Sequence, residues 1–366
     1  MSDVLQETAF GHHRLPNRFA LAPMTRTSAE PDGTPNQAMA EHYEAYAKGG
    51  FGLVITEGTY TDNQASQGYA NQPGIVNPAQ IEAWRGIVQR VHAAGSTIIA
   101  QLMHAGAQFQ ANHYTDQPVA PSTVKPKGAP LGMYGDQTEW KTPVAMTPDD
   151  IKLASDGFVQ AALNAKAAGF DGIELHAANG YLLNQFLSTY FNQRDDSYGG
   201  ALENRARILL DIIKATREAV GADFLLGVRL SQVTVTDPDY QWPEGEAGFR
   251  KIVEAVRDAG ADFVHTTDGH VTRAHFIDST QSLADAAATV EGIELIVNGG
   301  IHENNHQDIA AAYPRALLAV GKKALANPDF VQRLKDGKKV DDLDFAMLQP
   351  KATIANELAW RGKQAV

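Results

Sequence analysis

Three polar residues at the end of one apolar run have the chemistry of a catalytic cluster. His176, Asn179 and Tyr181 end or follow the run 169–176. The histidine and the asparagine lie three residues apart, so a single turn could aim an imidazole N–H and an amide N–H at one oxygen atom and stabilise the charge that develops on it. The phenol of Tyr181 is a candidate proton donor. Taken singly, the same residues also fit a hydrogen-bonded core histidine, a turn asparagine and a helix-cap tyrosine.

A second group of residues is typical of a phosphate site. Gly299 and Gly300 end a later apolar run, while Gly321 and Lys322 open the helix expected after the last run. The backbone N–H groups of a glycine-rich turn and of a helix N-terminus can bind an anion, and the lysine adds a cation. The alternative is that the glycines only make a turn and the lysine is solvated.

Further polar residues come at the ends of other apolar runs. Arg229 lies near the end of the run 221–231, which is a costly place for a guanidinium unless an anion lies beside it. A bound phosphate or a reduced flavin would supply that anion, and so would a structural carboxylate. Gln101 and Thr25 can hydrogen-bond the edge of a planar heterocycle, or they can satisfy local backbone groups.

Eight short apolar runs are the elements that must position these groups. Most of them follow a glycine that closes a helical stretch, such as 82–94 or 249–259, because glycine adopts the left-handed C-cap conformation without strain. Runs that are apolar throughout are typical of parallel strands covered by helices. The runs are 19–23, 49–56, 95–102, 169–176, 221–231, 260–267, 292–300 and 315–321.

Eight strand–helix units predict a (β/α)8 TIM barrel, and we expect residues 1–366 to form a single domain. An open, doubly wound sheet is disfavoured because no GxGxxG turn opens the first helix. In a barrel the active site lies where the strands end, which is where the polar residues above occur. The Pro- and Gly-rich segment 103–147 follows a strand, so we expect a functional loop on the catalytic face. The tail after Leu334 is expected to be an appendage to the last helix.

The composition excludes several classes of function. None of the 366 residues is cysteine, which excludes disulfides, iron–sulfur clusters, thiolate metal sites and cysteine nucleophiles. The net charge of -12 disfavours nucleic acid and anionic membranes as partners. The N-terminus lacks the basic start and apolar core of a signal peptide, and no apolar run reaches the ~20 residues of a membrane span, so we expect a cytoplasmic protein. The 12 histidines show no metal-ligand spacing with acids, and we predict no metal site.

Several segments together resemble the Old Yellow Enzyme family of flavin-dependent ene-reductases. The most family-specific of them is 176–187 (HAANGYLLNQFL), and the similarity extends over nearly the whole chain. The resemblance implies bound FMN, NADPH or NADH as the reductant, and an enone or nitroalkene as the small-molecule substrate. The other matching segments are 22–26 (APMTR), 56–59 (TEGT), 198–205 (YGGALENR), 229–231 (RLS) and 326–329 (ANPD).

The resemblance also implies FMN contacts for the residues at the strand ends. Thr25 would bond the flavin C4 carbonyl, and Gln101 would hold the pyrimidine edge. Arg229 would lie beside N1 and the C2 carbonyl, where it would stabilise the reduced, anionic flavin. The residues that would pack against the ring are Pro23, Met24 and Gly58, and those that would hold the phosphate are Gly299, Gly300, Gly321 and Lys322.

The same resemblance implies the catalytic roles. His176 and Asn179 would grip the activating oxygen of an α,β-unsaturated carbonyl or nitro compound. Hydride would reach the β-carbon from flavin N5, and Tyr181 would protonate the α-carbon from the opposite face, in a ping-pong cycle. A quinone reductase or a nitro-ester reductase would use the same site.

Several positions differ from the residue that many relatives carry, or distinguish one branch of the family from another. Lys322 replaces an arginine that forks onto the phosphate in many relatives, so FMN would be held less tightly unless Lys323 compensates. Met103 stands where many relatives carry tryptophan, which implies an adaptable pocket that accepts bulkier enones. Thr25 stands where some branches carry cysteine. Arg361 resembles an arginine that reaches a neighbouring subunit in some relatives, which would imply a homodimer; the alternative is a solvated terminal residue.

A function of a different class stays open, namely a barrel aldolase or isomerase that uses the phosphate site for a sugar phosphate. Such chemistry needs a Schiff-base lysine or a carboxylate base. The nearest acids are Glu57 and Glu174, and the second of these lies inside an apolar run. His104 and His265 are additional strand-end candidates for contact with flavin or substrate.

Overall fold

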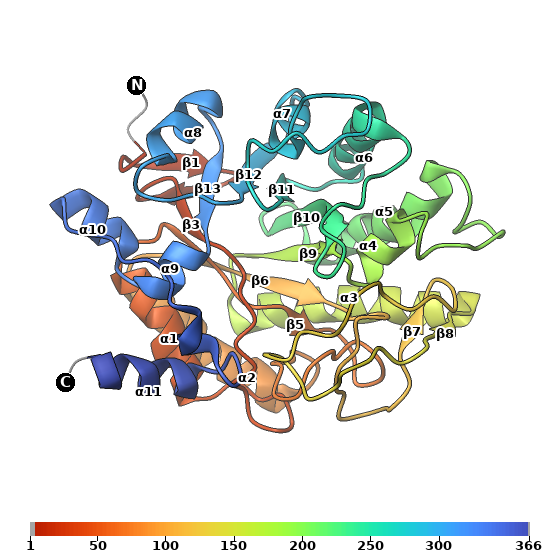
Figure 1. Cartoon of the computed structure of the whole chain (residues 1–366), viewed down its shortest axis with the longest axis horizontal. Coiled ribbons are helices and arrows are strands. Elements are labelled where there is room, and N and C mark those ends of the chain that lie inside the picture. Colours follow the sequence, from red (N-terminus) through yellow and green to blue (C-terminus); the bar gives the residue numbers. More distant parts are fainter. Residues whose placement is uncertain (1–3, 365–366) are drawn as a thin grey trace.

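Parallel strands surrounded by helices form the body of the molecule (Figure 1). The computed structural model describes residues 4–364. Within these residues eight strands close into a barrel, since each strand pairs with the next and the last pairs again with the first. The predicted (β/α)8 barrel is confirmed. In their order around the barrel, the strands are β3 (Phe19–Leu21), β4 (Leu53–Ile55), β6 (Thr97–Met103), β9 (Gly172–Asn179), β10 (Leu225–Thr234), β11 (Phe263–Thr267), β12 (Glu294–Asn298) and β13 (Leu317–Val320).

The helices begin and end at residues with clear local causes. The side chain of Thr147 accepts from the backbone of Asp150 and starts α3, and Gly169 ends it with a left-handed φ of 92°. Asn77 caps α2, so this helix starts before the predicted 82–94. The helices are α1 (Gln37–Lys48), α2 (Pro78–Ala93), α3 (Pro148–Ala168), α4 (Leu182–Leu187), α5 (Leu202–Val220), α6 (Gly245–Asp258), α7 (Leu283–Ala288), α8 (His306–Ala312), α9 (Lys322–Ala326), α10 (Phe330–Asp336) and α11 (Ile354–Gln364), with a 3-10 turn η1 (Phe345–Leu348).

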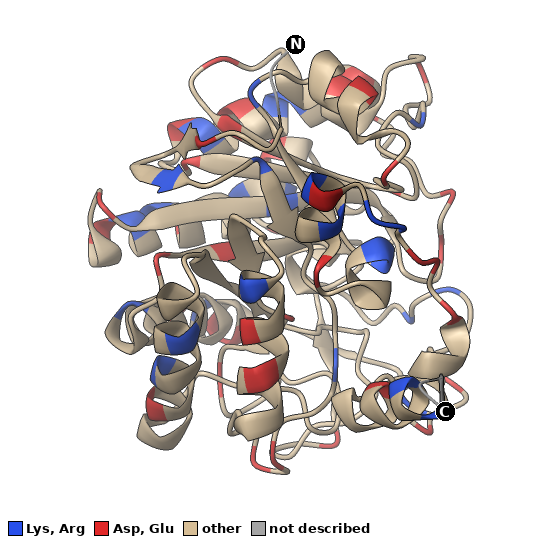
Figure 2. Cartoon of the chain, turned by 90° about the vertical axis from the view of Figure 1, so that its left-hand side faces the viewer, with Lys and Arg blue, Asp and Glu red and all other residues tan. Residues whose placement is uncertain are grey.

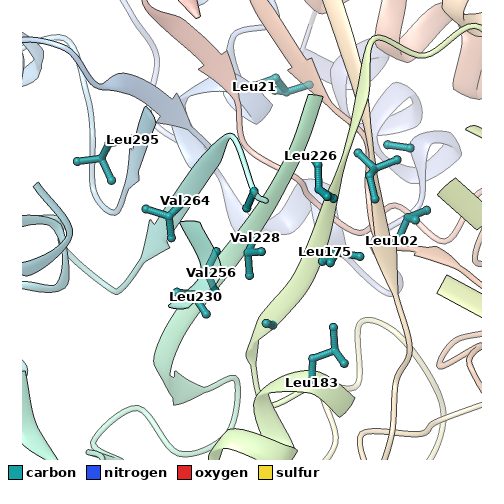
Figure 3. Packing of buried hydrophobic residues seen from close by; sticks show 14 of the residues in the cluster. Leu21, Leu102, Leu175, Leu183, Leu226, Val228, Leu230, Val256, Val264 and Leu295 are labelled. Carbon is teal, nitrogen blue, oxygen red and sulfur yellow. The ribbon is translucent and has the colours of Figure 1, made fainter. Parts of the chain in front are cut away.

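The alternation of side chains along β10 shows how the barrel divides its core. Leu226, Val228 and Leu230 point outwards and pack in the layer between the sheet and the helices (Figure 3). Leu225 therefore faces the barrel interior, where it joins a second, separate apolar cluster, and Arg229 lies on the same inner side closer to the carboxyl end. The barrel interior is thus apolar at the amino end of the strands and polar at their carboxyl end.

A short antiparallel hairpin that was not predicted closes the amino end of the barrel. It consists of β1 (Thr8–Phe10) and β2 (His13–Leu15). Phe10 and Leu15 are buried and belong to the interior apolar cluster. The ring centroid of Phe10 lies 5.4 Å from that of Phe263 on β11. The hairpin therefore plugs the end of the barrel that lies opposite the predicted active site.

Two segments cover the carboxyl end of the strands, which we call the mouth of the barrel. The first is the loop after β6 (residues 104–147, the β6 loop). It contains an unpredicted parallel pair of short strands, β7 (Val119–Ala120) and β8 (Val144–Ala145). Outside this loop, the short strand β5 (Thr59–Tyr60) pairs with β6. The second is the tail (residues 337–364), whose helix α11 packs beside α1 (Figure 1). The backbone N–H of Ala352 donates to the carbonyl of Met133 (2.9 Å), which joins the tail to the loop. The tail is therefore more than an appendage to the last helix.

Basic and acidic residues are mixed along the chain. Figure 2 shows Lys and Arg interspersed with Asp and Glu on the helices and loops. In the described part of the chain, no helix combines the length and the apolar character that crossing a membrane requires.

Candidate active site

A cavity of about 320 Å³ opens at the mouth of the barrel. Its walls combine residues from the ends of strands that are far apart in the sequence but adjacent in the closed sheet. The structure therefore brings most of the predicted site residues to one place. Those that line the cavity are Pro23, Met24, Thr25, Gln101, Met103, His176, Asn179, Tyr181, Arg229, Gly321 and Lys322.

Three predicted glycines are not among the residues that line the cavity. Gly58 packs against Met103, and a Cβ at this position would come within 2.6 Å of the sulfur atom. Gly299 and Gly300 have φ values of 146° and 61°, which favour glycine. Their turn packs against residues 268–271, and a Cβ on Gly300 would lie 2.9 Å from His270 Cδ2. The glycine pair therefore does make a turn, and this turn lies next to the strand that leads to Gly321.

The two lysines of the predicted phosphate site have different surroundings. Lys322 lines the cavity, and its Nζ lies 5.9 Å from the ring centroid of Phe345. Lys323 pairs with the carboxylates of Glu303 (3.1 Å) and Asp342 (2.8 Å). Because two acids already hold Lys323, Lys322 is the better placed of the two to meet a phosphate.

A left-handed turn after His176 fixes the candidate catalytic cluster. Strand β9 runs to Asn179, whose φ of 61° bends the chain, and Gly180 follows with a φ of 87°. The turn is held by side chains, since the backbone N–H of Asn179 donates to Ser231 Oγ (2.8 Å) and that of Gly180 donates to Asn184 Oδ1 (2.9 Å). The Asn179 side chain is thereby directed to the same cavity that His176 lines.

His176 is buried, and within residues 4–364 its Nδ1 atom has no hydrogen-bond partner. Burial, together with the charge of Arg229, lowers the pKa of this imidazole well below its usual range. The ring is therefore neutral and carries a single N–H donor. Because His176 also lines the cavity, this imidazole is placed to meet a ligand.

Tyr181 is joined to a second tyrosine that was not predicted. Its hydroxyl forms a short hydrogen bond with that of Tyr69, and the Tyr69 ring lies 5.1 Å from Tyr134 of the β6 loop. Burial raises the pKa of Tyr181 and Tyr69 above the usual range, so both phenols keep their protons. The ring of His176 lies 4.8 Å from that of Tyr181. Tyr69 lies in a loop between β5 and α2, where no pattern of residue types distinguishes it.

Arg229 is held at the cavity by neutral oxygen atoms. Its Nη2 donates to Asn298 Oδ1 (2.9 Å) and Thr267 Oγ1 (3.1 Å), and its Nε has no partner among the described residues. The structural carboxylate considered from the sequence is therefore not a direct partner of this guanidinium. Arg229 keeps donors for an anionic or electron-rich ligand.

The remaining acids and histidines named from the sequence lie outside the cavity lining. His265 is inside the barrel, where its Nδ1 lies 2.7 Å from Glu174 Oε2. His104 lines a separate small pocket beside Asp62. Glu57 is buried and accepts the backbone N–H of Arg26 (2.8 Å).

The tail is anchored beside the cavity by a buried ion pair. Arg26, the residue after Thr25, pairs with Glu357 of α11 (2.6 Å), and both side chains are buried. Arg361 bonds the same glutamate (3.1 Å) and donates to the carbonyl of Leu325. The guanidinium of Arg361 is thus engaged within its own chain, and it is not a solvated terminal residue.

An apolar wall of the cavity was also missed from the sequence. It comes from loops and from the tail, where apolar residues follow no strand or helix periodicity and only tertiary contacts give them a position. The residues of this wall are Leu131, Met133, Val235, Leu343, Phe345, Leu348 and Ala352.

The residues present suit a flavin. The cavity lining combines hydrogen-bonding groups, apolar residues and a lysine. One buried nitrogen atom beside the cavity, Arg229 Nε, lacks a partner within the described chain. A planar ligand with a polar edge, an apolar face and a phosphate matches this donor set.

Comparison with known proteins identifies the class. The family model described as "NADH:flavin oxidoreductase / NADH oxidase family" matches residues 6–341. A relative named probable flavin mononucleotide-dependent alkene reductase, from Leishmania infantum, is 33% identical over 94% of this chain and 93% of its own length. The solved Old Yellow Enzyme homologue from Zymomonas mobilis has a TM-score of 0.83 at 30% identity, covering 96% of this chain and 98% of that chain. The structure of morphinone reductase in complex with tetrahydroNAD has a TM-score of 0.82 at 31% identity, covering 93% and 92%.

The fold, the site and these similarities define an FMN-dependent NAD(P)H oxidoreductase built on a TIM barrel. The chain belongs to the NADH:flavin oxidoreductase / NADH oxidase family, and within it to the Old Yellow Enzyme type of ene-reductase.

Proposed function

We propose that this enzyme reduces the C=C bond of α,β-unsaturated carbonyl or nitro compounds at the mouth of the barrel, with NADPH or NADH as the reductant. The observation that carries the proposal is that the buried, neutral His176 lines the same cavity as Asn179 and Tyr181. These groups supply hydrogen bonds for one oxygen atom and a proton for a nearby carbon.

The strand ends supply the FMN contacts in this proposal. Thr25, Gln101 and Arg229 bond the polar edge of the ring. When bound, FMN supplies the hydride chemistry between the nicotinamide and the substrate, while the protein supplies orientation and electrostatics. Among the residues that line the cavity, apolar contact with the ring is assigned to Pro23 and Met24, and phosphate contact to Gly321 and Lys322. Ring contact by Gly58 and phosphate contact by Gly299 and Gly300 stay predictions, because these glycines do not line the cavity.

The catalytic cluster acts by hydrogen bonding and by proton transfer. His176 is neutral, so it donates an N–H to the substrate oxygen without giving up a proton, and Asn179 donates beside it. These bonds stabilise the negative charge that develops on that oxygen. Tyr181 keeps its proton because burial raises its pKa, and Tyr69 hydrogen-bonds the same hydroxyl, so Tyr181 is the proton donor.

The apolar wall supports substrates that carry a hydrophobic extension. Leu131 and Met133 of the β6 loop face the same cavity as Leu343 and Leu348 of the tail, and Met103 adds a flexible side chain. The relative named as an alkene reductase supports the reduction of a C=C bond. The aldolase or isomerase alternative loses its candidate bases, since Glu57 and Glu174 are both bound to other side chains or backbone groups.

The visible spectrum of the purified protein tests the proposal. A yellow protein that bleaches with NADPH or NADH without oxygen, and regains its colour with 2-cyclohexenone, is the expected result. A protein that stays colourless with added FMN would overturn the flavin site. Bleaching without recovery on the enone or on a nitroalkene would overturn the proposed substrate class.

Three further expectations stay predictions of this proposal. We propose that residues 1–366 act as one FMN-binding domain, because the tail contributes Leu343, Phe345 and Leu348 to the cavity. The other two are that the protein is a homodimer and that it is located in the cytoplasm. Size-exclusion chromatography with light scattering measures the oligomeric state, and fractionation of the source cells measures the location.

A further inference from the structure

A buried polar network lies directly beneath the cavity floor. Glu174 is fully buried and accepts hydrogen bonds from Gln101 Nε2 (2.8 Å) and from His265 Nδ1 (2.7 Å). Gln101 is register-paired with Glu174 across β6 and β9, and Arg229 is register-paired with His265 across β10 and β11. Gln101, which lines the cavity, is thus hydrogen-bonded to Glu174, and Arg229, which also lines it, lies on the strand next to that of His265.

The charge of Glu174 has no evident purpose in packing. The rest of the barrel interior is filled by residues such as Leu53, Ile99 and Phe263. A buried ion is often replaced by an apolar residue without loss of stability, so the ion itself adds little to the free energy of folding. Burial alone would raise the pKa of Glu174, but the charge and the hydrogen bond of His265, then the charge of Arg229 and the hydrogen bond of Gln101, bring it below its usual value.

The carboxylate also fixes the direction of the Gln101 amide. An ionised carboxylate accepts hydrogen bonds and cannot donate, so the amide nitrogen of Gln101 must face Glu174. The amide oxygen is then the atom directed elsewhere, as an acceptor. If Glu174 were neutral or absent, the amide would be free to turn over.

We propose that Glu174 is a positioning residue of the flavin site, which holds the Gln101 amide in one orientation and offsets the charge of Arg229. The inference rests on the proposed contacts of Gln101 and Arg229 with FMN. The guanidinium favours the reduced, negatively charged flavin, and a carboxylate beneath it weakens that preference. Glu174 therefore keeps the reduction potential of bound FMN lower than Arg229 alone would set it.

The substitution Glu174→Gln tests this inference, because it removes the charge and retains an oxygen that accepts from Gln101. The reduction of bound FMN is measured anaerobically at equilibrium with a reference dye. We expect the equilibrium to shift about tenfold towards reduced flavin, which is about 30 mV for a two-electron couple. The matched control is Glu294→Gln at the amino end of β12, and it should leave the potential unchanged.

A pair of variants at His265 covers the case in which Glu174→Gln does not fold. His265→Leu removes one donor, so the carboxyl takes up a proton and the potential should rise as in Glu174→Gln. His265→Asn keeps a short N–H donor and should restore the potential to within a few millivolts of the parent. If the reduction potential rises in His265→Leu and rises equally in His265→Asn, the inference is wrong.

Thermal unfolding of the apoprotein and of the FMN-bound protein separates this role from a structural one. If the variants lower both melting temperatures equally and leave the potential unchanged, Glu174 only supports the fold and the inference is wrong. If the parent protein binds no FMN, the proposed function fails, and this inference fails with it.

Discussion

The two ends of the barrel contrast in what fills them. At the amino end the hairpin residues Phe10 and Leu15 pack onto Leu225 and Phe263 in an apolar cluster. At the mouth the same inner face of β10 carries Arg229, and a cavity replaces the packed side chains. One end is closed by side chains of its own chain, while the other is built to be completed by a ligand.

This contrast separates stability from function within a single sheet. Apolar burial at the amino end contributes to the free energy of folding, with ~25 cal/mol per Å² removed from water. The mouth instead holds polar groups in a buried setting, and such groups are stable there only when they are hydrogen-bonded. Substitutions at the two ends should therefore have different consequences.

The largest effect is expected from truncating one phenylalanine at each end. Phe10→Ala leaves a cavity in the plug and should lower the free energy of unfolding by about 3–5 kcal/mol, with little change in kcat of the folded enzyme. Phe345→Ala, at an exposed residue beside the mouth, should cost less than about 1 kcal/mol and should change KM for bulky enones. Chemical denaturation and steady-state kinetics measure the two. Equal losses of unfolding free energy in Phe10→Ala and Phe345→Ala would contradict the proposed difference between the two ends of the barrel.

The next effect concerns His176, the proposed hydrogen-bond donor to the substrate oxygen atom. His176→Ala removes one of the two proposed hydrogen bonds and should lower kcat/KM for an enone by about 10²–10³-fold, while the absorbance of bound FMN stays the same. Stopped-flow measurement of the oxidative half-reaction isolates this step from reduction by the nicotinamide. His12→Ala, at an exposed residue near the hairpin, is the control. A variant with undiminished oxidative rate would remove His176 from the mechanism.

A smaller effect concerns the response of stability to pH. Burial raises the pKa of Glu57, beside Arg26 and Tyr43, from 4.5 to about 7. The folded protein binds this proton more tightly than the unfolded chain, so the stabilisation is fully present below pH ~4.5 and is lost as the pH rises through ~7. The loss should be on the order of 1–3 kcal/mol. Unfolding measured from pH 5 to 8 should show this slope in the parent, and Glu57→Gln should flatten it; an equal slope in both would assign it to other groups.

The smallest effect is expected from the second tyrosine. Tyr69→Phe removes the hydroxyl that bonds Tyr181, and the rate of the oxidative half-reaction should fall about three- to tenfold, as the loss of one hydrogen bond implies. FMN affinity and the reductive half-reaction should not change. A fall as large as that of Tyr181→Phe would instead make Tyr69 the proton donor.

The sequence predicted the parts of this molecule that depend on local pattern. Apolar runs that follow glycine identified the barrel strands, and polar residues at their ends identified much of the cavity lining. The hairpin was missed because β1 and β2 have only three residues each, too few for a periodicity. Tyr69, Tyr134 and the apolar wall were missed because loop and tail residues acquire their positions from tertiary contacts. Glu174 was noticed as an acid in an apolar run, but its partners depend on the register between strands.

The hydrogen bonds between the β6 loop and the tail have a consequence for chimeras made from related enzymes. Lys351 Nζ donates to the carbonyls of Gly132 (2.9 Å) and Gly135 (2.6 Å), so two segments more than two hundred residues apart share one wall of the cavity. A chimera that takes its tail from one parent and its β6 loop from another would bring together two cavity-lining segments whose side chains do not pack against each other in either parent. Substrate preference should therefore transfer only when both segments are moved together.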